Sequence, residues 1–157
     1  MNIKKIASAA MIGLAALSLA GCSLSNNVAS LEPYAPSDGV QLDTQALKVR
    51  NLILIQGASG KAALIGSFVS SGTQEVKASV ATKDAAGKDV RVEFKVPAGS
   101  KFDIGYNGTD PVTMQLDMVP GQMHEVYVSD GTDPIGALVP VVDGSLLEYS
   151  FYAESLD

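Results

Sequence analysis

The side chains best suited to metal chemistry in this sequence form a short cluster of methionine and histidine. Met114, Met118, Met123 and His124 lie close together in the chain, and His124 is its only histidine. Thioether sulfur and imidazole nitrogen are ligands that suit copper(I). Met114 and Met118 also alternate with apolar residues such as Val112, as side chains on the buried face of a strand do. We therefore expect core methionines, with a copper(I) site of Met114, Met123 and His124 as the alternative.

The other reactive side chain is Cys22. It is the only cysteine, which excludes disulfides within the chain and metal sites built from several cysteines. Lys4 and Lys5 precede an uncharged run over residues 6–20, and small residues stand just before Cys22. A basic segment, an apolar run shorter than a comfortable membrane span and a small-residue cleavage point are typical of a secretory signal peptide.

The segment Leu19-Ala20-Gly21-Cys22 resembles the lipobox of bacterial lipoproteins. The resemblance implies that a diacylglycerol is attached to the Cys22 sulfur and that cleavage makes Cys22 the N-terminus. Two or more acyl chains form a stable anchor, whereas one is marginal. We therefore expect residues 1–21 to be a lipoprotein signal peptide. The mature protein is then extracytoplasmic and lipid-anchored to the bacterial cell membrane.

The charge balance limits the partners. The formal net charge is −6 for the chain and becomes −8 without residues 1–21, which carry Lys4 and Lys5. An acidic surface repels phosphate backbones and anionic head groups. We expect no binding of nucleic acid and a membrane contact through the N-terminal lipid alone. A protein partner in the cell envelope remains open.

Two features that could indicate catalysis favour structural interpretations. Residues 57–61 (GASGK) resemble a phosphate-binding loop, but Ile55 and Ala62 stand where that motif needs Gly and Ser or Thr. The chain has no G-x-S-x-G motif for a nucleophile, and His124 is the one candidate histidine base. We expect no enzyme activity and no required cofactor.

The elements that position these residues are β-strands. Residues 90–96 alternate apolar and charged side chains without interruption, as a half-buried strand does. Residues 52–55 are a continuous apolar run, which is typical of a strand covered on both faces. Other runs with strand character lie at 62–70, 75–82, 102–106, 112–118, 126–128 and 146–153.

Regular turns between these runs predict the fold class. Seven to nine strands with turns every 8–12 residues favour an all-β domain, a single antiparallel β-sandwich over residues 42–157. Residues 22–41 are polar, contain Pro33, Pro36 and Gly39, and lack periodicity. We expect them to form a flexible tether between the lipid and the sandwich.

Several short segments of the expected sandwich carry a family resemblance. They are residues 49–52 (VRNL), 96–100 (VPAGS) with 112–116 (VTMQL), and 118–121 (MVPG) with 126–128 (VYV). Over residues 40–155 the chain thereby resembles the periplasmic copper chaperone (PCuAC) family and its actinobacterial LpqE-type lipoprotein relatives. The resemblance implies a cupredoxin-like or immunoglobulin-like β-sandwich without enzyme activity.

The copper ligands of that family are largely missing here. Its copper-binding members use two pairs of histidine and methionine, one of them spaced as His-x-Met. This sequence retains Met114 of that pair but has Val112 in place of the histidine. We therefore expect a non-catalytic interaction or accessory module of the cell envelope. The alternative is a copper(I) chaperone with a degenerate site of Met114, Met123 and His124.

Overall fold

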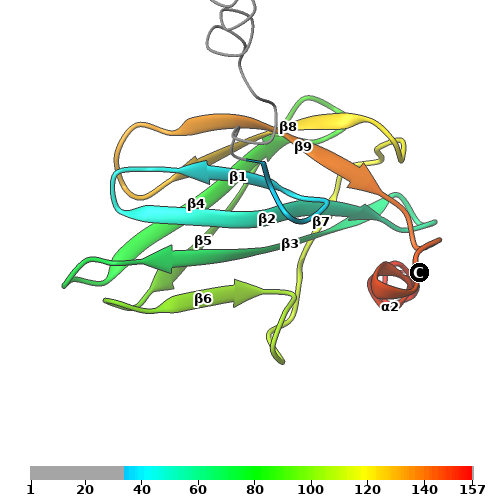
Figure 1. Ribbon diagram of the computed structural model, residues 1–157. Coiled ribbons are helices and arrows are strands. Elements are labelled where there is room, and N and C mark those ends of the chain that lie inside the picture. The colour runs from blue at the N-terminus through cyan, green and yellow to red at the C-terminus, as the bar shows by residue number, and fades with distance from the viewer. Residues whose placement is uncertain (1–33, 157) are drawn as a thin grey trace, which may run out of the picture. The chain divides into compact units, whose positions relative to one another are not determined.

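The computed structural model describes residues 34–156, of which residues 35–156 belong to one compact unit. The predicted signal peptide and Cys22 lie outside the described residues, as does most of the predicted tether over 22–41. Nine strands and one helix make up the described part (Figure 1). They are β1 (Val40–Asp43), β2 (Leu47–Gln56), β3 (Lys61–Ser70), β4 (Val76–Lys83), β5 (Asp89–Val96), β6 (Lys101–Ile104), β7 (Val112–Gln115), β8 (Met123–Ser129), β9 (Ile135–Val142) and α2 (Leu147–Glu154).

All nine strands join one sheet, which confirms the all-β class. The strand order is β5-β4-β8-β9-β2-β3-β6, with β1 added to β2 and β7 added to β3. Within the described residues every pairing is antiparallel except that of β2 with β9, where Leu54 pairs with Val141 and Ile55 with Val142. The expectation of a purely antiparallel fold is therefore wrong at this junction. Tight turns force neighbouring strands to be antiparallel, whereas β2 and β9 are far apart in the chain and are free of that constraint.

The sheet curls until its two outer strands, β5 and β6, approach each other and nearly close a barrel. Two aromatic contacts bridge the remaining gap. The rings of Phe94 (β5) and Phe102 (β6) are stacked with centroids 5.2 Å apart, and Phe68 (β3) meets Phe94 edge-on at 4.7 Å. Side-chain packing, not a hydrogen-bonded ladder, thus connects the first and last strands.

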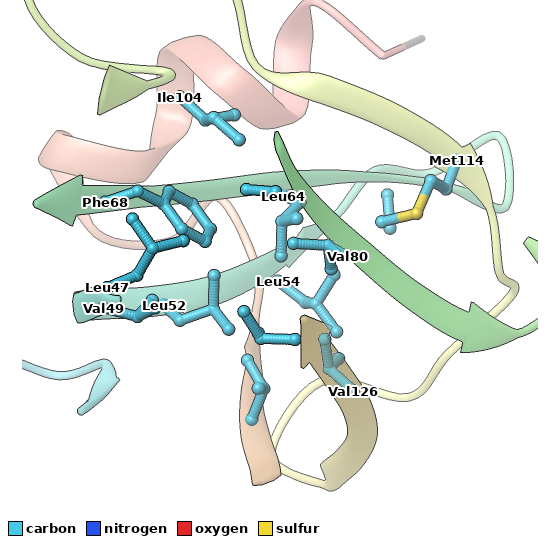
Figure 2. Packing of buried hydrophobic residues seen from close by; sticks show 14 of the residues in the cluster. Leu47, Val49, Leu52, Leu54, Leu64, Phe68, Val80, Ile104, Met114 and Val126 are labelled. Atoms are coloured by element: carbon cyan, nitrogen blue, oxygen red, sulfur yellow. The ribbon is translucent and has the colours of Figure 1, made fainter. Parts of the chain in front are cut away.

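The main core fills the inside of this curled sheet. Its side chains come from alternate positions of facing strands, as the period of two requires (Figure 2). Ten of its fully or nearly fully buried members are Leu47, Val49, Leu52, Leu54, Leu64, Phe68, Val80, Ile104, Met114 and Val126. The half-buried Val90 and Phe94 of β5 pack against the same cluster. The alternation predicted for residues 90–96 is confirmed.

A second, smaller core lies on the opposite face of β2 and β3. Ile53 and Ile55 point into it, and Tyr149 and Leu156 at the C-terminal helix cover them. This confirms that residues 52–55 form a strand covered on both faces. The strand predicted over residues 146–153 is wrong, because residues Leu147–Glu154 form helix α2.

The middle of β2 contains a β-bulge at Asn51. The register of β2 against β3 shifts at this point, and Asn51 has a φ of 54°, a conformation that asparagine tolerates better than most residues. Its side chain accepts a hydrogen bond from the Gly39 amide at 3.0 Å and donates one to the Tyr106 hydroxyl at 2.6 Å. These bonds secure the chain just before β1, which begins at Val40, so the last residues of the predicted tether belong to the sheet.

Candidate functional site

The histidine lies at a small hollow between the loop after β7 and the start of β8. The hollow has a volume of about 220 Å³. Its lining includes Met118, Met123 and His124 together with two carboxylates, Asp84 and Asp117. Met123 and His124 are the first two residues of β8, whereas Met118 and Asp117 follow the end of β7. The structure therefore brings three of the four candidate soft ligands to one place.

A hydrogen-bond chain defines which nitrogen of His124 is available. The Nε2 atom lies 2.7 Å from the Thr82 hydroxyl, and that hydroxyl donates its proton to the Glu125 carbonyl at 2.7 Å. Since a carbonyl only accepts, the hydroxyl must accept from Nε2, and Nε2 carries the ring proton. In the neutral ring Nδ1 then holds the lone pair that could bind a metal ion or accept a proton. His124 is thus oriented by the buried Thr82 on the adjacent strand β4.

The predicted ligand Met114 occupies a different place. Its side chain is 4% exposed and packs in the main core, where Figure 2 shows it among the apolar residues. It is not among the residues that line the hollow, whereas Met118 is. Met123 is 52% exposed. Sequence reasoning placed Met118 on the same face as Met114, and although β7 ends at Gln115, burial alternates through residue 118 and the half-buried Met118 packs against the main core.

A buried glutamine holds the loop that carries Met118. Gln56, at the end of β2, donates from Nε2 to the carbonyls of Gly57 and Lys61 at 3.0 and 3.1 Å. Its Oε1 accepts the backbone amide of Met118 at 3.0 Å. Both the amide nitrogen and the oxygen of the Gln56 side chain therefore bind backbone groups. These hydrogen bonds hold the loop in position beside the hollow. No signal in the sequence pointed to this role.

The outer face of the β8–β9 hairpin exposes three large side chains with apolar surface around one carboxylate. Met123, Glu125 and Tyr127 are successive outward residues of β8, and the cross-strand partner of Glu125 is Leu138 on β9. Leu138 is 59% exposed, and Tyr127 packs over Gly136. We call Met123, Tyr127 and Leu138 the outer β8–β9 face. Sequence reasoning missed it because residues 135–142 showed no clear alternation.

Comparison of the chain with protein-family models, with curated proteins and with solved structures gave no match. Two further findings concern residues 34–156 alone. No helix there is both long and apolar enough to cross a bilayer. No three side chains of the His, Cys, Asp or Glu type come together there in an arrangement that could hold a metal ion. That second finding does not count methionine sulfur. It therefore says nothing about a site that combines Met118 and His124 in the hollow.

The glycine-rich loop at residues 57–61 has a structural role. It is the turn of the β2–β3 hairpin, and Gly60 has a φ of 78°. The Ser59 hydroxyl and the Lys61 amine both donate to the carbonyl of Leu156, at 2.6 and 3.1 Å. A strand, not a helix, follows the loop, so no helix N-terminus is present to hold a phosphate. The expectation of a plain connection is confirmed.

The most strongly perturbed carboxylate in the domain is also structural. Asp130 accepts hydrogen bonds from the Thr44 hydroxyl (2.7 Å), the Ala46 amide (2.8 Å) and the Thr132 hydroxyl (2.6 Å). Partial burial alone would raise the pKa of Asp130, but these hydrogen bonds outweigh burial and hold the pKa well below its ordinary value. Asp130 thereby joins the β1–β2 loop to the β8–β9 loop.

Proposed function

We propose that this chain is a non-catalytic, lipid-anchored lipoprotein of the cell envelope that acts as a protein-interaction module. The motif ending at Cys22 supports the anchor, and the outer β8–β9 face supports the interaction. That face is the observation that carries the proposal, because Met123, Tyr127 and Leu138 present apolar area on two strands whose other face supplies Val126, Val128, Val139 and Val141 to the core. A protein partner is favoured over an anionic polymer, since the chain is acidic.

The anchor is tested by replacing its sulfur. We expect Cys22→Ser to remain an uncleaved or soluble precursor, because both acylation and cleavage need the thiol. The measurement is incorporation of a palmitate analogue together with membrane fractionation. The wild type should be labelled and sediment with membranes, and the variant should do neither. Equal labelling of the two proteins would rule out a lipoprotein.

The interaction is tested by photo-crosslinking in intact cells. A photoreactive residue at position 138 lies on the outer β8–β9 face, whereas one at position 48 lies on an exposed part of β2. We expect position 138 to give a discrete protein adduct that position 48 does not give. Adducts of the same size and yield at both positions, or at neither, would contradict a specific contact through this face.

A copper(I) chaperone is the second candidate, because the hollow gathers soft ligands. Met118, Met123 and the Nδ1 lone pair of His124 are the groups that would hold the ion, with Met118 in the place that the sequence suggested for Met114. Competition against a copper(I) chelator decides between the functions. The interaction module predicts no tight binding by the wild type. Tight one-to-one binding that disappears in Met123→Leu or His124→Ala would establish the chaperone instead.

Met114→Leu is the matched control in that titration. Leucine conserves the volume of the buried methionine, so we expect a loss of less than about 1.5 kcal/mol of unfolding free energy. Leucine cannot bind copper, so a site that used Met114 would lose its affinity in this variant. A site at the hollow would keep it.

The finer description of the fold belongs to the same proposal. The likeness to the PCuAC and LpqE-type proteins suggests a β-sandwich of cupredoxin-like or immunoglobulin-like type. Its support is the main core, which receives side chains from β2 and β3 on one side and from β4 and β8 on the other.

A further inference from the structure

Strand β5 is a free edge of the sheet. All eight of its residues pair with β4 in one continuous register, and no other described strand is hydrogen-bonded to it. Natural proteins usually protect such an edge with charged side chains, a proline, a bulge or a very short strand, and of these β5 has the charges alone. Residues Asp89–Val96 contain no proline or glycine, and their ladder has no bulge. The outward backbone groups of β5 form no ladder within the described residues, and β6 approaches this side near Phe94, whose ring stacks on that of Phe102.

The charges on β5 form a self-complementary pattern. Asp89, Arg91, Glu93 and Lys95 are exposed and alternate in sign along one face, while the residues between them point inward. If two copies of β5 lie antiparallel about a twofold axis through Val92, Asp89 faces Lys95 and Arg91 faces Glu93. All four cross-strand pairs then join opposite charges, which stabilises neighbouring strands.

Other registers do not have this property. A twofold axis through Arg91 or Glu93 places that residue opposite its own copy and brings like charges together. A parallel, in-register pairing sets every charge beside itself. A twofold axis one pleat away, through Val90 or Phe94, keeps the signs complementary but matches fewer charges. The Val92 register is the one that uses the whole strand.

We propose that β5 pairs with β5 of a second copy of this chain, antiparallel about a twofold axis through Val92, so that the two sheets become continuous. The interface is isologous, as in most dimers. The partner is another copy because the pattern complements itself; a strand of a different protein would need the same alternation of signs by chance.

The current neighbours of these charges are consistent with the pairing. Lys95 lies directly opposite Lys77 on β4, an unfavourable pair that Glu75 relieves from the side at 3.0 Å. Asp89 of the second copy would add a second carboxylate there. The existing ion pairs of Arg91 with Glu93 (3.1 Å) and of Asp89 with Lys83 (2.6 Å) are exposed, so sharing them with a second chain costs little.

The inward side of β5 also leaves apolar area to cover. Val90, Val92 and Phe94 are only half-buried, unlike their cross-strand partners Thr82, Val80 and Ala78 on β4. A hollow of about 770 Å³ lies against the strand, lined in part by Phe94, Phe102 and Lys95. In the Val92 register Val90 meets Phe94 of the second copy and the two Val92 side chains meet each other. Pairing would thus bury apolar surface as well as join charges.

The test is the oligomeric state of the full chain in a density-matched mild detergent, measured by analytical ultracentrifugation over a range of concentrations. We expect the wild type to form a dimer that weakens as salt is raised. Arg91→Glu should weaken the dimer about tenfold or more, because two attractive pairs become repulsive. The double variant Arg91→Glu/Glu93→Arg reverses both signs and should restore it. Lys48→Glu, with the same change of net charge on β2, should have no effect.

Two readouts separate a lost interface from a lost fold. Circular dichroism should show the same strand content in the wild type and all three variants. A monomeric wild type at every concentration would overturn the proposal, and so would a double variant that stays as weak as Arg91→Glu. Equal weakening by Lys48→Glu would also overturn it, since the effect would then follow net charge and not the β5 register.

Discussion

Asp130 shows how one residue can hold two distant loops together. Its carboxylate receives three short hydrogen bonds, and two of them come from the β1–β2 loop. A charged acceptor makes such bonds stronger than neutral ones. The residue has no access to the hollow at His124, so its low pKa is a property of the framework. A perturbed carboxylate here indicates stability, not catalysis.

We expect Asp130→Asn to lower the unfolding free energy at neutral pH by about 1–3 kcal/mol, because the donors lose a charged acceptor. The pKa of Asp130 is lower in the folded than in the unfolded state. Its contribution is therefore fully present above the unfolded pKa near 3.9 and is lost as pH falls toward the folded pKa. Urea unfolding at pH 7 and pH 3 should show a smaller difference between the two pH values for the variant than for the wild type.

Asp133→Asn is the control, since Asp133 is an exposed carboxylate in the same loop. It should change the stability by less than about 0.5 kcal/mol at either pH. An equal loss for both variants would mean that loop charge in general, and not the hydrogen bonds of Asp130, is responsible.

At the scale of the element, the sequence pattern wrongly predicted a strand where helix α2 forms. Its buried positions Tyr149, Tyr152, Ala153 and Leu156 follow helical spacing, but Leu147 and Phe151 on the other face are apolar too. Apolar residues on both faces hide the period of 3.6 and resemble a strand. By contrast, residues 90–96 were predictable because charge marks their outer face at every second position.

Two aromatic residues of α2 provide a direct test. Tyr149 is 7% exposed and donates to Asp38 at 2.8 Å, whereas Phe151 is 71% exposed. We expect Tyr149→Ala to cost about 3 kcal/mol of unfolding free energy and Phe151→Ala less than about 0.5 kcal/mol. Denaturant melts of the two variants measure this. In a strand residues 149 and 151 would share a face, so comparable losses would argue against the helix.

The candidate site was predictable only in part, because the backbone features that place Met118 leave no pattern in the sequence. Met123 and His124 are adjacent in a strand, which directs their side chains to opposite faces and argued against a shared site, yet both line the hollow. Met118 joins them through the positive φ of Asp117 and the hydrogen bond from its amide to Gln56, and neither feature has a clear signature in the sequence. Met114 is buried as its alternation predicted.

At the scale of the whole domain, the sheet closes through aromatic rings. Phe94 contacts both Phe68 and Phe102, so one side chain of β5 connects to two strands that it does not pair with. Local patterns predicted each of these strands but not their meeting, because strand order depends on contacts between residues far apart in the chain. The closure of the sheet is therefore a property that only the folded domain reveals.

We expect Phe94→Ala to lower the unfolding free energy by about 2–3 kcal/mol, since it removes a half-buried ring and two aromatic contacts. Phe94→Leu keeps most of the volume and should lose clearly less. Thermal or urea unfolding at low protein concentration measures both. If alanine and leucine cost the same, ring geometry would be the decisive factor and not the filling of the gap.

The parallel junction of β2 and β9 bears on the order in which the domain forms. Only Leu54 with Val141 and Ile55 with Val142 pair across it, and more than half of the domain lies between them in the chain. The hairpins β2–β3 and β8–β9 close short loops, so their hydrogen bonds can form early. The junction of β2 with β9 closes a much longer loop, and the larger loss of chain entropy delays it. The two hairpin halves are then separate folding units joined by a narrow seam. Amide hydrogen exchange across that seam should report the first opening of the native state, before either hairpin melts.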